Sequence, residues 1–210
     1  MKHVKFGKQQ IVAAVSVLAV VASPAVASAA VDTKNTTINA TVNAAISMTT
    51  SSTVAVTVTP TTGGAVSSNS DTVTVSTNRA TGYNLKLSDA DTTTTLVSGA
   101  NTFTAPTATW GSAAALTNGK WGYGIASGTA GLTAASGFDA SYSAENSNSS
   151  STSKWLGIAS SASPQTLKTT SAAALNDTTT VWYAIKADLS QPESNGTPYT
   201  DSVTYTATTN

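Results

Sequence analysis

Two runs of alternating side chains within residues 71–88 constrain the fold of this chain more than any other feature. In the first run valines alternate with threonines, and in the second Tyr83, Leu85 and Leu87 alternate with polar residues. Period-two alternation is typical of a β-strand with one face in the core and the other in water. The polar residues 77–82 between the runs include a glycine, which tolerates the positive φ of a tight connection. We expect a β-hairpin here, or two strands that cross between sheets.

Similar alternation indicates strands elsewhere in the chain. The segments are residues 31–47 (with Ile38, Ala40 and Val42 alternating), 53–59, 96–97, 102–104, 120–126, 154–158, 178–187 and 199–207. In residues 120–126 glycines alternate with large side chains, so we expect another backbone or a large side chain to lie against the glycines. About nine short strands, with turn signals and no convincing amphipathic helix, predict an all-β fold: an antiparallel β-sandwich or an open barrel.

The first 30 residues have the pattern of a secretory signal peptide. Lysines at positions 2, 5 and 8 precede an uncharged apolar run from Ile11 to Val21, and small residues at 25–30 offer overlapping A-x-A cleavage sites. The run is too short for a stable membrane span. We therefore expect residues 1–30 to be a cleaved, helical signal peptide and residues 31–210 to be one secreted β-domain, without an integral membrane segment after cleavage.

Composition excludes several classes of function. Loss of the three N-terminal lysines leaves seven basic residues against ten acidic ones, so we expect neither nucleic acid nor an anionic membrane as a partner. The chain has no cysteine, and its single histidine, His3, lies in the expected signal peptide. The mature chain would have neither an imidazole nor a thiol for acid–base, nucleophilic or zinc chemistry. These features predict a non-enzymatic protein without a cofactor.

Acidic residues offer two weaker candidates for chemistry. Asp139 and Glu145 could form an acid–base pair, but their polar surroundings favour solvated loop carboxylates. Asp89 and Asp91 precede a run of threonines and could bind calcium through oxygen ligands. The segment lacks the glycine and the later acidic residue of a calcium-binding loop, so we expect an ordinary turn and no metal site.

Two segments stand out, residues 81–88 (TGYNLKLS) and residues 196–207 (GTPYTDSVTYTA). The first is similar to the first motif of the WxL domain, a glycine before Trp-x-Leu, and the second is similar to the ending of that domain, which carries the second Trp-x-Leu. The WxL domain is a secreted all-β domain that attaches non-covalently to the cell wall of Gram-positive bacteria. In this chain Tyr83 and Tyr205 stand at the tryptophan positions, with Leu85 and Ala207 at the leucine positions. The resemblance implies a β-sandwich at the cell surface, with cell-wall glycan as its partner.

Four segments follow one another in a characteristic order: STNRATGY (76–83), KWGY (120–123), VWYAIKAD (181–188) and YTDSVTYTAT (199–208). This order resembles more closely that of a group of short secreted surface proteins from bacteria with reduced genomes. This second resemblance implies an extracellular location.

The tryptophans are the best candidates for contact with a partner. Trp110, Trp155 and Trp182 could offer flat faces to a sugar ring or a protein groove. We expect Trp121 to fill the core instead, because it lies on the same face as Tyr123 in an alternating strand.

Three functions fit these observations. The first is a non-enzymatic surface protein that binds cell-wall glycan or another surface protein. The second is a structural subunit of an extracellular assembly, in which residues 36–46 of one copy complete the sheet of another. The third is a carbohydrate-binding module.

Overall fold

The computed structural model of this chain describes residues 30–133, 137–146 and 151–210. By its internal contacts the chain divides into two units, with the boundary between Thr41 and Val42. Residues 30–41, the described part of the first unit, contain no helix or strand, and every strand belongs to the second unit. The expected signal peptide lies outside the described residues, apart from Ala30. Among the described residues no helix is long and apolar enough to cross a membrane.

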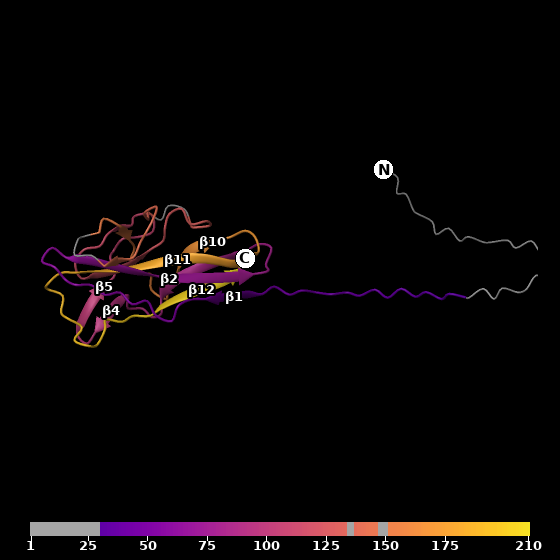
Figure 1. Cartoon of the computed structure of the whole chain (residues 1–210), viewed down its shortest axis with the longest axis horizontal. Helices are drawn as coiled ribbons and strands as arrows, with labels where there is room; N and C mark the ends of the chain where they lie inside the picture. The colour runs from indigo at the N-terminus through magenta and orange to yellow at the C-terminus, as the bar shows by residue number, and fades with distance from the viewer. Residues whose placement is uncertain (1–29, 134–136, 147–150) are drawn as a thin grey trace, which may run out of the picture. The chain divides into compact units, whose positions relative to one another are not determined.

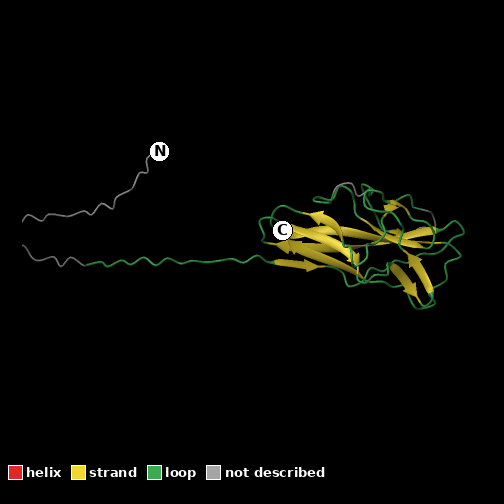
Figure 2. Ribbon diagram, turned by 180° about the vertical axis from the view of Figure 1, so that it is seen from behind, coloured by secondary structure: helices red, strands yellow, loops and turns green. Residues whose placement is uncertain are grey.

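The second unit is built from β-strands, and its described residues contain no helix (Figure 2). The strands are β1 (Ile46–Thr49), β2 (Ala65–Thr77), β3 (Tyr83–Asp89), β4 (Thr95–Ser98), β5 (Asn101–Thr104), β6 (Ala114–Ala115), β7 (Lys120–Gly124), β8 (Glu145–Asn146), β9 (Lys154–Trp155), β10 (Gln165–Thr169), β11 (Ala174–Ala187) and β12 (Val203–Thr209). The all-β prediction is confirmed. The structure also contains three strands that were not expected, β6, β8 and β10, of which the first two are only two residues long.

The strands form three sheets. The largest has the order β1–β2–β11–β7–β5–β4 with β8 also beside β2, the second has the order β10–β3–β12, and the third pairs β6 with β9. Neighbouring strands are antiparallel, except that β5 and β7 meet in parallel at Thr104 and Lys120. The long strands β2 and β11 lie side by side and pair from Ala65 with Ala187 to Thr77 with Ala174 (Figure 1).

The segment of residues 71–88 crosses between sheets. Its first strand belongs to β2 in the large sheet, and its second strand, β3, is the centre of the three-stranded sheet. The hairpin alternative is therefore wrong, and the crossing is right. Gly82 makes the entry to β3 possible: its φ is 80°, and a Cβ at this position would lie 2.4 Å from the carbonyl oxygen of Thr170.

The large and the three-stranded sheets share one hydrophobic core. Its centre is made of fully buried side chains from β2, β3, β10 and β11: Val73, Val75, Leu85, Leu87, Leu167 and Val181. Each such side chain contributes roughly 1.5–3 kcal/mol by its removal from water. Because the inward positions of β2 and β3 are the apolar positions of the alternation, the sequence pattern sets which face of each sheet is buried.

The glycines of β7 allow close packing, as the sequence predicts. A Cβ at Gly122 would lie 2.5 Å from the carbonyl oxygen of Leu156, and one at Gly124 would lie 2.7 Å from the ring of Tyr142. Backbone bonds between Tyr123 and Leu156, each 2.9 Å long, hold the two segments together. Glycine is thus required where a second backbone lies against the sheet.

Two expected strands are absent from the described structure. In residues 31–47 the only strand residues are Ile46 and Ser47, at the start of β1, and residues 53–59 contain no strand. In the second segment the valines are half-buried and the threonines exposed, so the alternation gave the correct faces. Alternation reports which side chains face the core, whereas a strand also needs a neighbouring backbone to pair with. That neighbour is missing in both segments.

Candidate functional site

The four tryptophans divide between the core and the surface. Trp121 and Trp155 are 4% and 1% exposed. The core position expected for Trp121 is confirmed, and Trp155 presents no face to a partner. Trp110 is half-buried and meets the ring of Phe138 edge-on, with 5.7 Å between ring centroids. Trp182 is also half-buried, so Trp110 and Trp182 are the candidates that keep part of their rings in contact with solvent.

An open hollow of about 380 Å³ lies beside Trp182. Its wall includes Thr178 and Thr180 from the same strand and Tyr142 from a neighbouring loop. The hydroxyl of Tyr142 donates to the carbonyl oxygen of Lys154 at 2.6 Å, which fixes that ring. An aromatic face with hydroxyl groups beside it can stack on a sugar ring, so this hollow is a candidate carbohydrate site.

The four WxL-like positions lie on adjacent strands of the three-stranded sheet. Leu85 on β3 is the direct partner of Ala207 on β12. Tyr83 and Leu85 are fully buried, and Tyr205 and Ala207 are half-buried. The hydroxyl of Tyr205 lies 2.7 Å from that of Tyr183 on the large sheet, and burial raises the pKa of both groups. These side chains join the two sheets, and Tyr83 and Leu85 offer no exposed surface to a cell-wall ligand.

Asp201 lies near Asp89 and Asp91, which are distant from it in sequence, at the end of β3. Asp89 is fully buried, and its Oδ1 accepts a 3.0 Å bond from the backbone N–H of Asp91. Burial, followed by the charges of Asp89 and Asp91, raises the pKa of Asp201 to about 6. Asp89 Oδ2 and Asp201 Oδ2 are both buried without a hydrogen-bond partner. The described residues include no group of three His, Cys, Asp or Glu side chains suited to a metal ion. The neighbouring carboxyl groups disfavour the charged form of Asp201.

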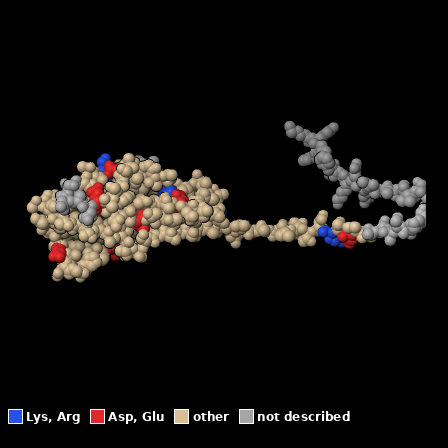
Figure 3. All heavy atoms as spheres, viewed as in Figure 1, with Lys and Arg blue, Asp and Glu red and all other residues tan. Residues whose placement is uncertain are grey.

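Asp139 and Glu145, which were considered as an acid–base pair, each accept a hydrogen bond from residues 151–154. Asp139 Oδ2 accepts a 2.6 Å bond from the backbone N–H of Lys154, and Glu145 Oε1 accepts a 2.7 Å bond from the hydroxyl of Ser151. Elsewhere charge is sparse: on the face shown in Figure 3, Lys and Arg do not gather into a patch.

The segment before β1, which we call the arm (residues 30–45), has no strand or helix. Val31, Ile38 and Val42 are 81%, 88% and 85% exposed. Ile38, Ala40 and Val42 alternate with Asn39 and Thr41, so the arm has the side-chain pattern of a strand without a strand partner. Exposed apolar side chains at regular positions are typical of a surface that binds another surface.

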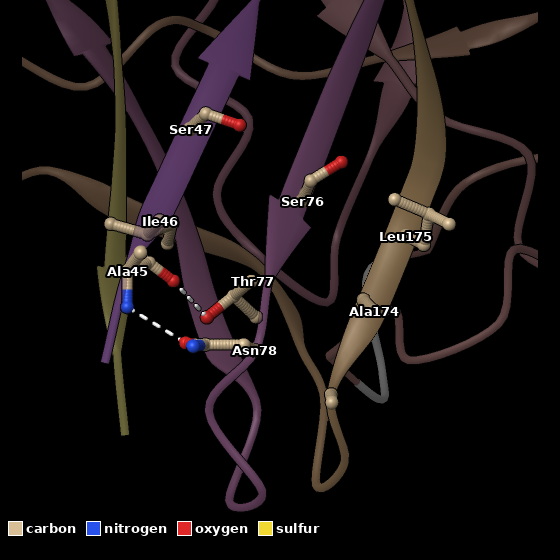
Figure 4. Close-up of a pocket in the computed structure, with 9 residues that line it drawn as sticks. Ala45, Ile46, Ser47, Ser76, Thr77, Asn78, Ala174 and Leu175 are labelled. Atoms are coloured by element: carbon tan, nitrogen blue, oxygen red, sulfur yellow. Dashed lines mark hydrogen bonds between the residues drawn. The ribbon is translucent and has the colours of Figure 1, made fainter. Parts of the chain in front are cut away.

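The end of the arm, residues 42–45, belongs to the second unit and is held by hydrogen bonds, two of which are drawn in Figure 4. The backbone N–H of Ala45 donates to Asn78 Oδ1 at 2.7 Å, and the hydroxyl of Thr77 donates to the carbonyl oxygen of Ala45 at 2.7 Å. Asn78 Nδ2 donates to the carbonyl oxygen of Asn43 at 2.9 Å. Beside this junction lies an open hollow of about 500 Å³, whose wall includes Leu175, itself 83% exposed.

Comparison of this chain with protein-family models, with curated proteins and with solved structures found no match.

Proposed function

We propose that this chain is a secreted, non-enzymatic cell-surface protein that acts as a structural subunit. In this proposal the two large sheets form a β-sandwich, and the arm of one copy adds a strand to the sandwich of the next. The observation that carries the proposal is the arm itself: its residues have a strand-like pattern with exposed apolar side chains, but residues 30–45 contain no strand.

Binding of the arm would bury apolar side chains and satisfy backbone groups. Burial of Ile38 and Val42 would each contribute roughly 1.5–3 kcal/mol, and pairing would satisfy the backbone groups of the segment. This gain must exceed the cost of ordering the arm and of association, which is itself several kcal/mol. Residues 35–70 contain no charged residue, so no charge would have to be desolvated when the arm pairs with another strand.

Burial and composition argue against two other functions, cell-wall binding through the WxL-like positions and catalysis. Wall binding through the WxL-like positions would need Tyr83 and Leu85 at the surface, and both are fully buried. Catalysis would need reactive groups, and residues 31–210 contain neither histidine nor cysteine. The secreted location rests on the signal-peptide pattern of residues 1–30.

Sedimentation velocity of the exported full chain tests the proposal. We expect a series of oligomers from the wild type and a monomer from the double variant Ile38→Asp/Val42→Asp. A matched control, Asn39→Asp/Thr41→Asp, adds the same charge on the opposite side of the arm and should still assemble. A monomeric wild type, or equal assembly by both double variants, would overturn the proposed function.

The hollow beside Trp182 supports a second candidate function, binding of cell-wall glycan. Sedimentation with purified insoluble cell wall tests it. We expect the wild type to sediment with the wall, and Trp182→Ala to stay in solution, while Trp110→Ala serves as the control. Equal retention of all three proteins would exclude a role for this hollow.

A further inference from the structure

The edge strands of the large sheet and of the three-stranded sheet differ in whether another segment of the chain is bonded to their outer side. Each sheet has two edge strands: β1 and β4 in the large sheet, β10 and β12 in the three-stranded sheet. At β10, the backbone of residues 131–133 is bonded to Leu167 and Thr169 at 3.0 and 2.8 Å. At β4, Val97 and Thr200 exchange two backbone bonds of 3.0 Å. Among the described residues, β1 and β12 lie close to one another, but neither has a hydrogen-bonded strand or bridge on its outer side.

The register of β12 shows which of its backbone groups point outward. Ala90 N–H donates to the carbonyl oxygen of Ser202, and Asn210 N–H donates to that of Gly82, so the even-numbered residues of this segment bond to β3. In an antiparallel pair the alternate residues direct their N–H and C=O groups to the other side. The odd-numbered residues 203–209 therefore present a row of backbone donors and acceptors at the free edge.

The core is open on the same side. Val203, Tyr205 and Ala207 of β12 pack against the core but remain half-exposed. On the facing sheet, Ile46 and Met48 of β1 are also half-exposed. The corresponding core residues of β2, β3 and β11 are fully buried. Core side chains beside β12 thus lack the cover that a further strand would give.

The edge of β12 also lacks the usual protection against pairing. Edge strands of soluble proteins commonly carry lysine, proline or a bulge that prevents addition of another strand. Residues 203–210 contain no charged residue and no proline, and the register of β12 against β3 is unbroken from Val203 to Thr209. β1 is the shorter alternative, with four residues against seven.

We propose that the free edge of β12 is the acceptor site, and that its occupant is residues 36–42 of a second copy of this chain. Ile38, Ala40 and Val42 have the same two-residue spacing as the three half-exposed core residues of β12 and would cover the open side of the core. Asn39 and Thr41 would extend the outer face formed by the threonines of β12. Donor and acceptor are different surfaces, so the contact is head-to-tail and produces an open filament wherever the rotation between copies does not close a ring.

This inference rests on the proposed function. A proline substitution in β12 tests the acceptor site separately from the role of the arm. Ala207→Pro removes one outward N–H of β12 and leaves the bonds to β3 in place, whereas Ala207→Val keeps the N–H. We expect Ala207→Pro to give monomers with an unchanged unfolding midpoint in urea, and Ala207→Val to assemble. If Ala207→Pro assembles like the wild type while Ile38→Asp/Val42→Asp does not, the arm is the donor but β12 is not the acceptor.

Mixing the two defective full-length proteins tests whether the arm acts between chains. The Ile38→Asp/Val42→Asp protein keeps an intact β12, and the Ala207→Pro protein keeps an intact arm. We expect the mixture to form a 1:1 dimer that grows no further. Absence of a dimer would overturn the proposal.

Cross-linking gives a second test that does not depend on proline. The chain has no cysteine, so cysteines can be introduced in pairs. We expect Asn39→Cys combined with one of Thr204→Cys, Thr206→Cys or Thr208→Cys to give disulfide-linked oligomers on a non-reducing gel. Failure of all three pairs in a protein that still assembles would place the acceptor elsewhere.

Discussion

A buried ion pair between the two large sheets gives the sharpest prediction about stability. Lys168 on β10 places its Nζ 2.6 Å from Asp177 Oδ1 on β11, and the side chains are 3% and 28% exposed. The hydroxyl of Tyr83 donates to Asp177 Oδ2 at 2.8 Å. Burial, with the charge of Asp177, raises the pKa of Tyr83 and keeps it a donor. One carboxylate therefore links two groups from the three-stranded sheet to the large sheet.

Removal of either partner leaves the other charge without compensation, at a cost of about 3–5 kcal/mol when both are fully buried. Asp177 is partly solvated, so Lys168→Met should cost less, about 2 kcal/mol. Asp177→Asn leaves the more deeply buried ammonium alone and should cost about 4 kcal/mol. The double variant Lys168→Met/Asp177→Asn has neither charge. We expect its loss of unfolding free energy to be about 2 kcal/mol smaller than the sum of the losses of the two single variants.

Urea unfolding followed by tryptophan fluorescence measures these free energies, provided that the slope with urea is the same for all variants. Lys154→Met, at an exposed position, is the control and should change stability by less than about 0.5 kcal/mol. If the two single losses add to the double loss within about 0.5 kcal/mol, the ion pair does not couple the sheets and the reasoning is wrong.

Three further predictions concern single sites. The raised pKa of Asp201 means that the folded state binds a proton at this carboxyl group more tightly than the unfolded state does. Protonation of Asp201 therefore stabilises the fold fully below about pH 4, and this stabilisation is lost as pH rises through about 6. The wild type should be more stable to urea at pH 5 than at pH 7.5 by no more than about 1 kcal/mol, since the carboxyl is partly solvated, and Asp201→Asn should remove this difference. Gly122→Ala places a Cβ 2.5 Å from a backbone oxygen and should cost about 2 kcal/mol by thermal unfolding. Gly128→Ala, with nothing within 4 Å, is its control and should cost much less. Leu85→Asp should cost about 4 kcal/mol in urea, whereas Lys86→Asp, on the outer face of the same strand, should stay within about 0.5 kcal/mol; equal losses would mean that both faces are covered.

The sequence predicted those parts of the fold whose signal is local. Alternation located β3 and the inner face of β2, and the glycines of residues 120–126 predicted a close neighbour that the structure supplies as Leu156 and Tyr142. The strand β10 gave no such signal. Its register shifts between Thr166 and Lys168, so that Leu167 and Lys168 are both buried and the period of two is lost.

Contacts between distant segments could not be predicted from the sequence. Nothing in the local pattern relates Asp201 to Asp89, or Lys168 to the Asp177 carboxylate, because each partner looks like an ordinary polar residue of a turn or a strand. In the arm, by contrast, the local pattern is clear, but residues 30–45 contain no strand. Its alternation is as regular as that of β2, but the partner that would make it a strand is not present in the described residues of one chain.

The junction at Asn78 has a mechanical consequence for a filament joined through its arms. Tension along the filament would reach each subunit through residues 43–45, where the Asn78 side chain holds two backbone groups and the Thr77 hydroxyl holds a third. Beyond them, β1 contributes four paired residues, and Asp71 accepts a 2.9 Å bond from the backbone N–H of Ser51 just after the strand. Under tension, the hydrogen bonds of residues 43–51 would therefore break first, while the pairing of β2 with β11 would remain intact.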